Sequence, residues 1–483
     1  METLKEKTAK SLFWAVLNNG SLQLLNILFG VVLARLLTPG DYGIVGVLTI
    51  FTLIAGNLQS GGFSQGLINL KSPQSNDYNS VFWFNVIISG ILYAFLWFCS
   101  PLIAAFFHQP VLVGVSRFVF LSFLISSLGI AHGAYMSKNM MNREIAIINI
   151  IALLCSGMTG IVLAYLGFSY WSLAWQQVIF ISITNLGRFY YVPWRPSFAI
   201  DFGPVKRMFS FSVKILLTNI INTLNGQILT LIFGRLFHIS VVGLFTQANK
   251  WNTQAHSFVS GTLLQVAQPV LVSVSEDRER LLRVFRKMLR FSAFISFPVM
   301  LGLAFVSKEF ILVALGEKWV DCFPLLRILC VAGAFMPFYT VFQNLTIGCK
   351  RSDIYLWCNV GLIVVQIVCI LLCYYCFSQS IVAVVMVYSF ILVAWLAVWQ
   401  QVAARLTGLS WKDTLMDIVP FLVITASVIG ISYVFTMWIH NVWLLLASKV
   451  LISVLLYVFI MKTLKVKIFT ECIEFAKQKI SRK

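Results

Sequence analysis

A polar stretch in the middle of the sequence carries the residues best suited to bind a ligand. Residues 243–268 (GLFTQANKWNTQAHSFVSGTLLQVAQ) are long enough to cross a membrane, which takes about 20 helical residues. Helical spacing places a lysine and several small polar residues on one stripe: Thr246, Lys250, Thr253 or Gln254, Ser257 and Gly261. Polar groups in hydrocarbon are expensive unless they face a protein interior or water, so the stripe predicts the wall of a polar path. The alternative is a helix buried on all sides, with Lys250 bonded to a backbone carbonyl.

The composition is that of a membrane protein with many spans. The chain has 483 residues, of which 59% are hydrophobic and 11% are charged, and its mean hydropathy is +0.88. A net charge of +19 would suggest a nucleic-acid partner in a soluble protein, but here the basic residues lie in short loops between apolar stretches. We therefore expect an all-α polytopic membrane protein with no nucleic-acid partner. The basic start leads into a full-length span, so we expect no cleavable signal peptide.

Apolar stretches separated by turn residues predict fourteen transmembrane helices. Their predicted ranges are 12–37, 43–69, 79–107, 111–136, 144–167, 170–192, 209–236, 241–267, 289–307, 325–347, 354–377, 380–404, 416–438 and 442–462. The breaks contain residues that favour turns, as in Thr38-Pro-Gly-Asp41 and Ser72-Pro73.

The charge of the loops predicts the orientation. Most of the 36 Lys and Arg residues fall on the side of the membrane that holds the N-terminus. Cytoplasmic loops carry an excess of Lys and Arg, so we expect both termini to be cytoplasmic. The expected location is the inner (plasma) membrane, which the chain crosses many times.

The long inner breaks predict the domain organisation. Residues 1–195 form an N-terminal lobe of helices 1–6, a cytoplasmic linker spans 196–208, and residues 209–407 form a C-terminal lobe of helices 7–12. Helices 13 and 14 occupy 408–463, and a basic cytoplasmic tail follows at 464–483. That tail is predicted to be either a surface helix on anionic lipid or a solvated segment.

An internal repeat supports this division. An offset of 200 residues aligns several identical residues without a gap: Arg35-Leu36 with Arg235-Leu236, Gly43 with Gly243, Ala55 with Ala255, Ser60-Gly61 with Ser260-Gly261, and Gln65 with Gln265. Both halves start on the same side of the membrane, so the two lobes are predicted to be parallel repeats. Substrate sites in such transporters lie between the repeats near the middle of the membrane.

Helices 1, 2, 7 and 8 are the polar ones, and we expect them to line a central cavity. The candidate substrate-binding residues are Lys250, Lys214, Asn19, Gln23, Asn57, Gln65, Asn219, Asn222, Gln254 and His256. Arg35 and Arg235 lie near the outer ends and are candidates for an outer gate or for interfacial anchoring. Lys214 could instead extend to the inner surface, and His256 could be a hydrogen-bonded interior residue.

The distribution of charge predicts the ligand. All seventeen acidic residues fall in loops or at helix ends, so the cavity offers cations without fixed negative charge. Such a cavity attracts an anion such as phosphate or pyrophosphate, and its amides and hydroxyls can bond sugar hydroxyls. No grouping of acids, His or Ser suggests catalysis, so we expect no enzyme activity, catalytic residue, metal or cofactor. Coupling to a proton or sodium gradient stays open.

Four ordered motifs carry a resemblance to a known family. They are Ala34-Arg-Leu-Leu-Thr-Pro-Gly-Asp-Tyr-Gly43, Val242-Gly-Leu-Phe245, the run Pro269-Val-Leu-Val-Ser-Val-Ser-Glu-Asp-Arg-Glu-Arg-Leu-Leu-Arg283, and Leu315-Gly-Glu-Lys-Trp319 with Pro324-Leu-Leu-Arg-Ile-Leu329. The sequence resembles the polysaccharide branch of the multidrug/oligosaccharidyl-lipid/polysaccharide exporters. It is similar to the Wzx-type flippases that serve exopolysaccharide or teichuronic-acid-like polymers.

The resemblance implies a function and a set of partners. It implies a flippase that moves undecaprenyl-pyrophosphate-linked oligosaccharide units from the inner to the outer leaflet by alternating access, for surface polysaccharide synthesis. Membrane lipid, a polysaccharide polymerase and glycosyltransferases are the further partners. The family's cavity cations correspond to Lys250 and Lys214, whereas the family's arginine in the middle of helix 1 or 2 is missing here.

Two other functions stay open at this point. A drug or cation antiporter of the same superfamily would need a buried carboxylate that exchanges cations for protons. A lipid-linked glycan polymerase would need a sizeable outer loop with catalytic polar residues.

Overall fold

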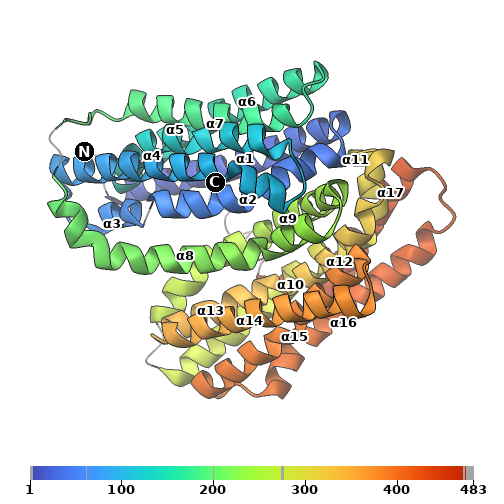
Figure 1. Ribbon diagram of the computed structural model, residues 1–483. Helices are drawn as coiled ribbons and strands as arrows, with labels where there is room; N and C mark the ends of the chain where they lie inside the picture. The colour runs from blue at the N-terminus through green and yellow to red at the C-terminus, as the bar shows by residue number, and fades with distance from the viewer. Residues whose placement is uncertain (1–3, 61, 199–200, 274–276, 472–473, 475–483) are drawn as a thin grey trace. The chain divides into compact units, whose positions relative to one another are not determined.

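The computed structural model describes residues 4–60, 62–198, 201–273, 277–471 and 474 (Figure 1). These residues form helices and turns, with no strand among them. Contacts divide the chain into two compact units, Met1–Gly243 and Leu244–Lys483.

The described residues of the first unit form eight complete helices and the start of a ninth. They are α1 (Leu4–Leu36), α2 (Pro39–Ser60), α3 (Phe63–Asn69), α4 (Ser75–Phe106), α5 (Leu112–Lys138), α6 (Asn142–Tyr165), α7 (Tyr170–Tyr191) and α8 (Gly203–Leu236). Within the unit, α8 packs on α2, α3 and α4. Contacts therefore group α8 with the helices before it, and the predicted lobe boundary at 196–208 stays a prediction.

The second unit begins inside α9 (Ile239–Ser273) and holds the remaining helices. They are α10 (Arg278–Phe305), α11 (Ser307–Ala314), η1 (Glu317–Trp319), α12 (Cys322–Gly333), α13 (Met336–Gly348), α14 (Ser352–Leu372), η2 (Cys373–Phe377), α15 (Ile381–Thr407), α16 (Trp411–Thr436) and α17 (Val442–Thr463).

Among the described residues, twelve helices are long and apolar enough to cross a membrane. The multi-pass membrane prediction is therefore confirmed. The predicted helices at 170–192 and 241–267 correspond to α7 and α9, which are not among the twelve. Polar residues such as Gln247, Asn249 and Lys250 lower the hydropathy of α9. A total of fourteen transmembrane helices in two six-helix lobes stays a prediction.

Several predicted boundaries were wrong. The predicted helix 43–69 is interrupted at Gly62, whose φ of 73° lies in the left-handed region that favours glycine. The predicted span 325–347, by contrast, agrees with one candidate membrane span, Cys322–Gly348, in which Ala334 and Phe335 separate α12 from α13. The basic run that starts at Arg278 belongs to the first turns of α10 rather than to a loop, because the Asp277 carboxylate accepts the backbone N–H of Arg280 at 3.0 Å and caps the helix.

Two short segments, 39–43 and 239–243, approach each other reciprocally inside the first unit. A Cβ atom added to Gly43 would lie 2.0 Å from the carbonyl oxygen of Ile239. A Cβ atom added to Gly243 would lie 1.7 Å from the carbonyl oxygen of Pro39. Positions 39 and 239, like 43 and 243, differ by the 200 residues of the predicted repeat. The contact is thus the one that a two-fold relation between equivalent segments produces, and only glycine fits at both places.

The segment between α7 and α8 is bonded to the start of α4. The Trp194 indole N–H donates to Ser75 Oγ at 3.1 Å, and the Ser197 backbone N–H donates to Asn79 Oδ1 at 2.9 Å. Asp201 accepts the backbone N–H of Gly203 at 2.8 Å and the Asn76 side chain at 2.8 Å. These two bonds stabilise the carboxylate, so the pKa of Asp201 lies below its usual value. We call the described residues of this segment, 193–198 and 201–202, the strap.

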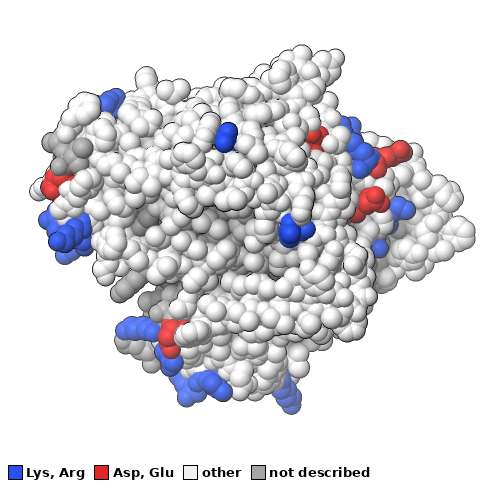
Figure 2. Space-filling view, in the orientation of Figure 1, with Lys and Arg blue, Asp and Glu red and all other residues white. Residues whose placement is uncertain are grey.

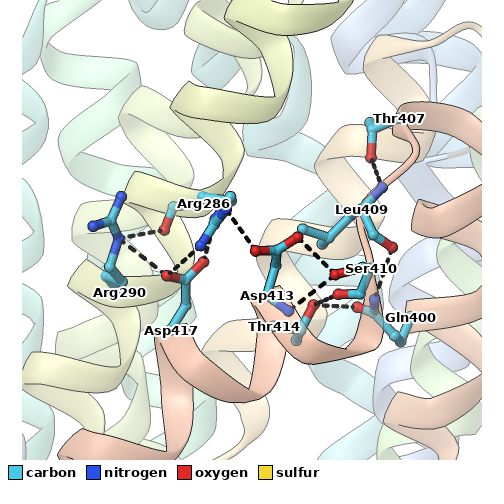
Figure 3. Close-up of polar contacts among 9 residues, drawn as sticks. All are labelled: Arg286, Arg290, Gln400, Thr407, Leu409, Ser410, Asp413, Thr414 and Asp417. Atoms are coloured by element: carbon cyan, nitrogen blue, oxygen red, sulfur yellow. Dashed lines mark hydrogen bonds and ion pairs between the residues drawn. The ribbon is translucent and has the colours of Figure 1, made fainter.

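An ion-pair cluster joins α10 to α16 in the second unit (Figure 3). The Arg286 guanidinium donates to both oxygens of Asp417, at 2.7 and 3.2 Å, and to Asp413 at 2.9 Å. Arg290 lies 3.5 Å from Asp417, and Ser410 caps α16 by accepting the backbone N–H of Asp413 at 3.1 Å. The bidentate geometry fixes the start of α16 against α10. On the face drawn in Figure 2, most of the surface is uncharged, and the charged side chains form a few separate groups.

Candidate functional site

A cavity lined mainly by carboxamides lies between α2 and α8 in the first unit. Its volume is about 420 Å³, and we call it the amide cavity. Its walls come from two helices: Leu53 and Asn57 from α2, and Asn219, Asn222, Thr223, Gly226 and Gln227 from α8. The cavity therefore brings together three of the predicted binding residues, Asn57, Asn219 and Asn222.

Helical spacing explains how the chain builds this cavity. The α8 residues recur at intervals of three and four, which puts them on one face of the helix. Asn57 donates through Nδ2 to Thr223 Oγ1 at 2.7 Å, which fixes its carboxamide against α8. Among the lining residues no side chain carries a formal charge. The cavity is thus equipped to donate and accept hydrogen bonds with neutral hydroxyl-rich groups.

Leu53, Thr223 and Gly226 were not among the predicted binding residues. Thr223 lies four residues after Asn219, so its position on the polar face of α8 was available from the spacing. Gly226 leaves space, and Leu53 supplies an apolar wall; neither carries a polar group that marks it in a sequence.

Lys250 lies on a partly exposed face of α9, described here within the second unit. The side chain is half-buried, whereas Thr253 and Ser257 beside it on the predicted stripe are exposed. Lys250 has no carboxylate partner among the described side chains. The stripe therefore presents an uncompensated ammonium together with hydroxyl groups.

The face of α9 that carries Gln247, Trp251 and Asn252, beside the Lys250 stripe, is buried in the second unit. Gln247 is fully buried, and the Trp251 ring packs edge-to-face on Phe310 with centroids 5.0 Å apart. Asn252 lies against Gly333, where an added Cβ atom would come within 2.4 Å of Asn252 Oδ1. Because this face packs on the unit, the orientation of the Lys250 stripe is fixed. Between residues 244 and 257, α9 thus has one buried face and one partly exposed face, and the role of the stripe stays a prediction.

A second lysine within a predicted span, Lys449 on α17, has the opposite surroundings. Its ammonium lies 2.8 Å from Glu309 Oε1 and 4.5 Å from the centroid of the Phe305 ring. Both partners of the ion pair are about nine-tenths buried. Lys449 therefore joins α17 to α11 and α10, and its charge is already neutralised.

The acidic residues that the structure describes lie in loops or near helix ends, as the sequence predicted, but three of them are buried. Glu309 pairs with Lys449, and Asp417 pairs with Arg286. Asp41 accepts the backbone N–H of Thr38 at 2.8 Å and its hydroxyl at 2.7 Å. The sequence could not show this burial, because the partners of Glu309 and Asp417 are more than 100 residues away.

The remaining predicted residues are dispersed. Asn19 on α1 and Gln65 on α3 are exposed, and Gln23, Gln254 and His256 are half-buried. None of them lines the amide cavity, and their roles stay predictions. The side chain of Lys214 lies outside the described part of the structure.

The two outer arginines differ in what the structure shows. Arg235 donates to the carbonyl of Phe106 at 2.7 Å and lies over the Phe106 ring at 5.3 Å, so it anchors α8 to the end of α4. Anchoring at the membrane interface and a role in an outer gate both stay predictions for Arg235. Arg35 is exposed at the end of α1.

Comparison with known proteins gives the family. A family profile described as "Polysaccharide biosynthesis protein" matches residues 32–324, which is more than half of the chain. The chain belongs to this polysaccharide biosynthesis family. The resemblance predicted from the sequence motifs is thereby confirmed.

Among similar family members is the lipopolysaccharide biosynthesis protein WzxC of Escherichia coli (strain K12). It is 25% identical over 358 residues, which cover 73% of this chain and 72% of WzxC. The structure titled "Lipid II flippase MurJ, inward closed conformation" matches 96% of this chain and 99% of its own, with a TM-score of 0.71 at 15% identity. An inward-facing multidrug resistance MATE transporter matches 80% of this chain and 96% of its own, with a TM-score of 0.63 at 15% identity. At this identity the two structures establish the fold alone.

Proposed function

We propose that this protein is a flippase for undecaprenyl-diphosphate-linked oligosaccharides. It moves complete repeat units from the inner to the outer leaflet for surface polysaccharide synthesis, by alternating access. Membership of the polysaccharide biosynthesis family supports the pathway. The single observation that carries the proposal is the setting of Lys250. This lysine lies on a partly exposed polar face of a long helix and has no acidic partner among the described residues.

Two sets of groups divide the work of binding. An ammonium held away from bulk water attracts an anion strongly, so Lys250 binds the diphosphate. The uncharged amide cavity offers donors and acceptors to the hydroxyls of the sugars. The polyprenyl chain stays in the bilayer. No covalent bond of the substrate changes, which makes the protein a transporter and not an enzyme.

The location, orientation and partner enzymes of the protein belong to the same proposal. The protein resides in the inner (plasma) membrane with both termini in the cytoplasm, as the loop charges indicate. Glycosyltransferases act before this protein, and a polysaccharide polymerase acts after it. Proton or sodium coupling stays a hypothesis.

A cation antiporter is the second candidate, because a MATE transporter shares the fold. Such a mechanism uses a carboxylate that can release one cation and take another. The three buried carboxylates described above are each held by hydrogen bonds or ion pairs. The partner-free intramembrane charge described here is instead a cation, which favours an anionic cargo.

The test compares variants in a strain that lacks the gene and therefore the surface polymer. Wild type, Lys250→Met, Lys250→Arg and Thr253→Ala are expressed at matched membrane levels. Lys250→Met keeps the side-chain length and removes the charge, while Thr253→Ala alters the same stripe without touching the charge. Surface polymer and lipid-linked units on each leaflet are measured.

We expect Lys250→Met to lower export at least about tenfold, since a hydrogen bond to a charged group contributes ~1.5–3 kcal/mol. Complete units should accumulate on the inner leaflet, and Lys250→Arg and Thr253→Ala should retain most export. Normal polymer with Lys250→Met would refute the diphosphate role. Units that reach the outer leaflet but stay unpolymerised without the protein would indicate a polymerisation factor instead.

A further inference from the structure

A second pocket in the first unit lies at the other end of α8, between α8 and α4. Its volume is about 470 Å³, and we call it the aromatic pocket. Three phenylalanines, one valine, one lysine and one serine line it: Phe84, Phe202, Val205, Lys206, Phe209 and Ser210. Phe202 and Phe209 leave about half of their side-chain surface exposed, at 43% and 53%. Apolar surface of this kind in an open pocket marks a place for an apolar ligand.

The pocket carries one uncompensated charge. Lys206 is exposed and has no ion-pair partner among the described side chains. Its neighbour Arg207 points elsewhere and pairs with Asp77 at 3.4 Å. A ligand complementary to this pocket therefore joins a negative group to an apolar body.

The pocket lies at the level expected for the inner headgroups. The uncharged stretch of α8 begins after Lys214, at Ile215, so positions 202–210 precede it by 5–13 residues, or about 8–20 Å along a helix. The ring of Trp83 packs on Phe198 of the strap with centroids 5.6 Å apart. Tryptophan beside other aromatic residues is typical of a membrane–water interface. By the predicted orientation, this interface is the cytoplasmic one.

The aromatic pocket and the amide cavity lie on the same face of α8. Val205 and Thr223 are 18 residues apart, and so are Phe209 and Gln227. Eighteen residues complete five helical turns, which returns a side chain to the same face about 27 Å further along. The face is thus apolar with a cation near the cytoplasm and rich in amides within the span.

We propose that the aromatic pocket holds the polyprenyl diphosphate end of the lipid carrier before translocation. Lys206 binds the diphosphate, and the phenylalanines contact the first isoprene units. This inference rests on the proposed flippase function and names a further binding site for the same substrate. We commit to the carrier rather than to a bulk phospholipid because the α8 face continues into an amide cavity suited to the attached sugars.

The test measures binding of undecaprenyl diphosphate to the full-length protein in nanodiscs of phosphatidylethanolamine. Wild type is compared with Lys206→Gln, Arg207→Gln and Phe209→Ala. Arg207→Gln is the matched control, since it removes the same charge one residue away and outside the pocket. Inorganic diphosphate and phosphatidylglycerol serve as competitors, and export is measured in the deletion strain for the same variants.

We expect Lys206→Gln to weaken binding about fivefold, because one lysine beside an anionic headgroup contributes about 1 kcal/mol. Arg207→Gln should leave the affinity unchanged. Phe209→Ala should also weaken binding, and neither competitor should displace the probe at equal concentration. Equal affinity of Lys206→Gln and wild type, or displacement by phosphatidylglycerol, overturns the carrier site. If the carrier site fails in this way but the wild-type protein still restores export in the deletion strain, only the site is refuted. If the wild-type protein changes neither the lipid-linked units nor the polymer in that strain, the flippase function itself is refuted.

Discussion

The helices α2 and α9 are related by the 200-residue repeat, and they are alike in packing but not in chemistry. Gly43 and Gly243 take part in the same reciprocal backbone contact. Val47 and Gln247 are both fully buried. At position 47 and its equivalent 247 the repeat preserves burial, although an apolar residue is exchanged for a polar one.

The difference lies in the charge. Ile50 is 2% exposed on α2, whereas Lys250 at the equivalent position of α9 is half-buried with no described acidic partner. On α2 the polar group that contributes to a cavity is Asn57, bonded to Thr223. The comparison teaches that α2 supplies a neutral hydrogen-bonding group, whereas α9 supplies a cation.

The largest expected effect comes from exchanging the two equivalent residues. Ile50→Lys should lower stability by roughly 3–5 kcal/mol, because it buries a charge without a partner. Lys250→Ile should leave folding nearly unchanged and lose export. Thermal unfolding in detergent and export in the deletion strain measure the two losses separately. Equal melting temperatures for the two variants would contradict the distinction between positions 50 and 250.

A smaller loss of stability is expected at Gly43 and Gly243, where the two repeats make the same backbone contact. Gly43→Ala and Gly243→Ala should each lower stability by about 1–3 kcal/mol, because the added methyl overlaps a backbone carbonyl. Gly40→Ala is the control, since an added Cβ there would meet its nearest atom, Ser240 Oγ, at 3.6 Å. Comparison of the melting temperatures checks this prediction. A loss at one glycine without the other would remove the evidence for a symmetric contact.

The smallest effect concerns the neutral cavity of the first unit. Asn57→Ala and Thr223→Val each remove the bond of 2.7 Å and should cost about 1 kcal/mol of stability, with a partial loss of export. The double variant should cost less than the sum of the singles, since both remove one shared bond. Additive losses in a double-mutant cycle would show that the two side chains act independently.

Sequence reasoning found the elements of the site that depend on residue type and helical period. The stripe around Lys250 follows from spacing alone, and so does the polar face with Asn219 and Asn222. The membrane-spanning architecture follows from hydropathy. The repeat offset was visible in a few identities, and the contact of Gly43 with Ile239 agrees with it.

Other features depend on partners distant in the chain and could not be predicted. Lys449 and Lys250 look equivalent in the sequence, yet Glu309, 140 residues from Lys449, pairs with only one of them. The close neighbour of Gly62 is equally distant in the chain: the carbonyl oxygen of Ser212 would lie 2.5 Å from a Cβ atom added there. Hydropathy gives no sign of either.

The strap has a consequence for the order in which the protein assembles. Its bonds run from Trp194 and Ser197 to the start of α4, and so depend only on residues that precede α8. A chain that folds during synthesis completes its N-terminal parts first. The ribosome can therefore deliver α8 into the membrane beside a neighbour that is already in place, with its starting point held by Asn76 and Asp201.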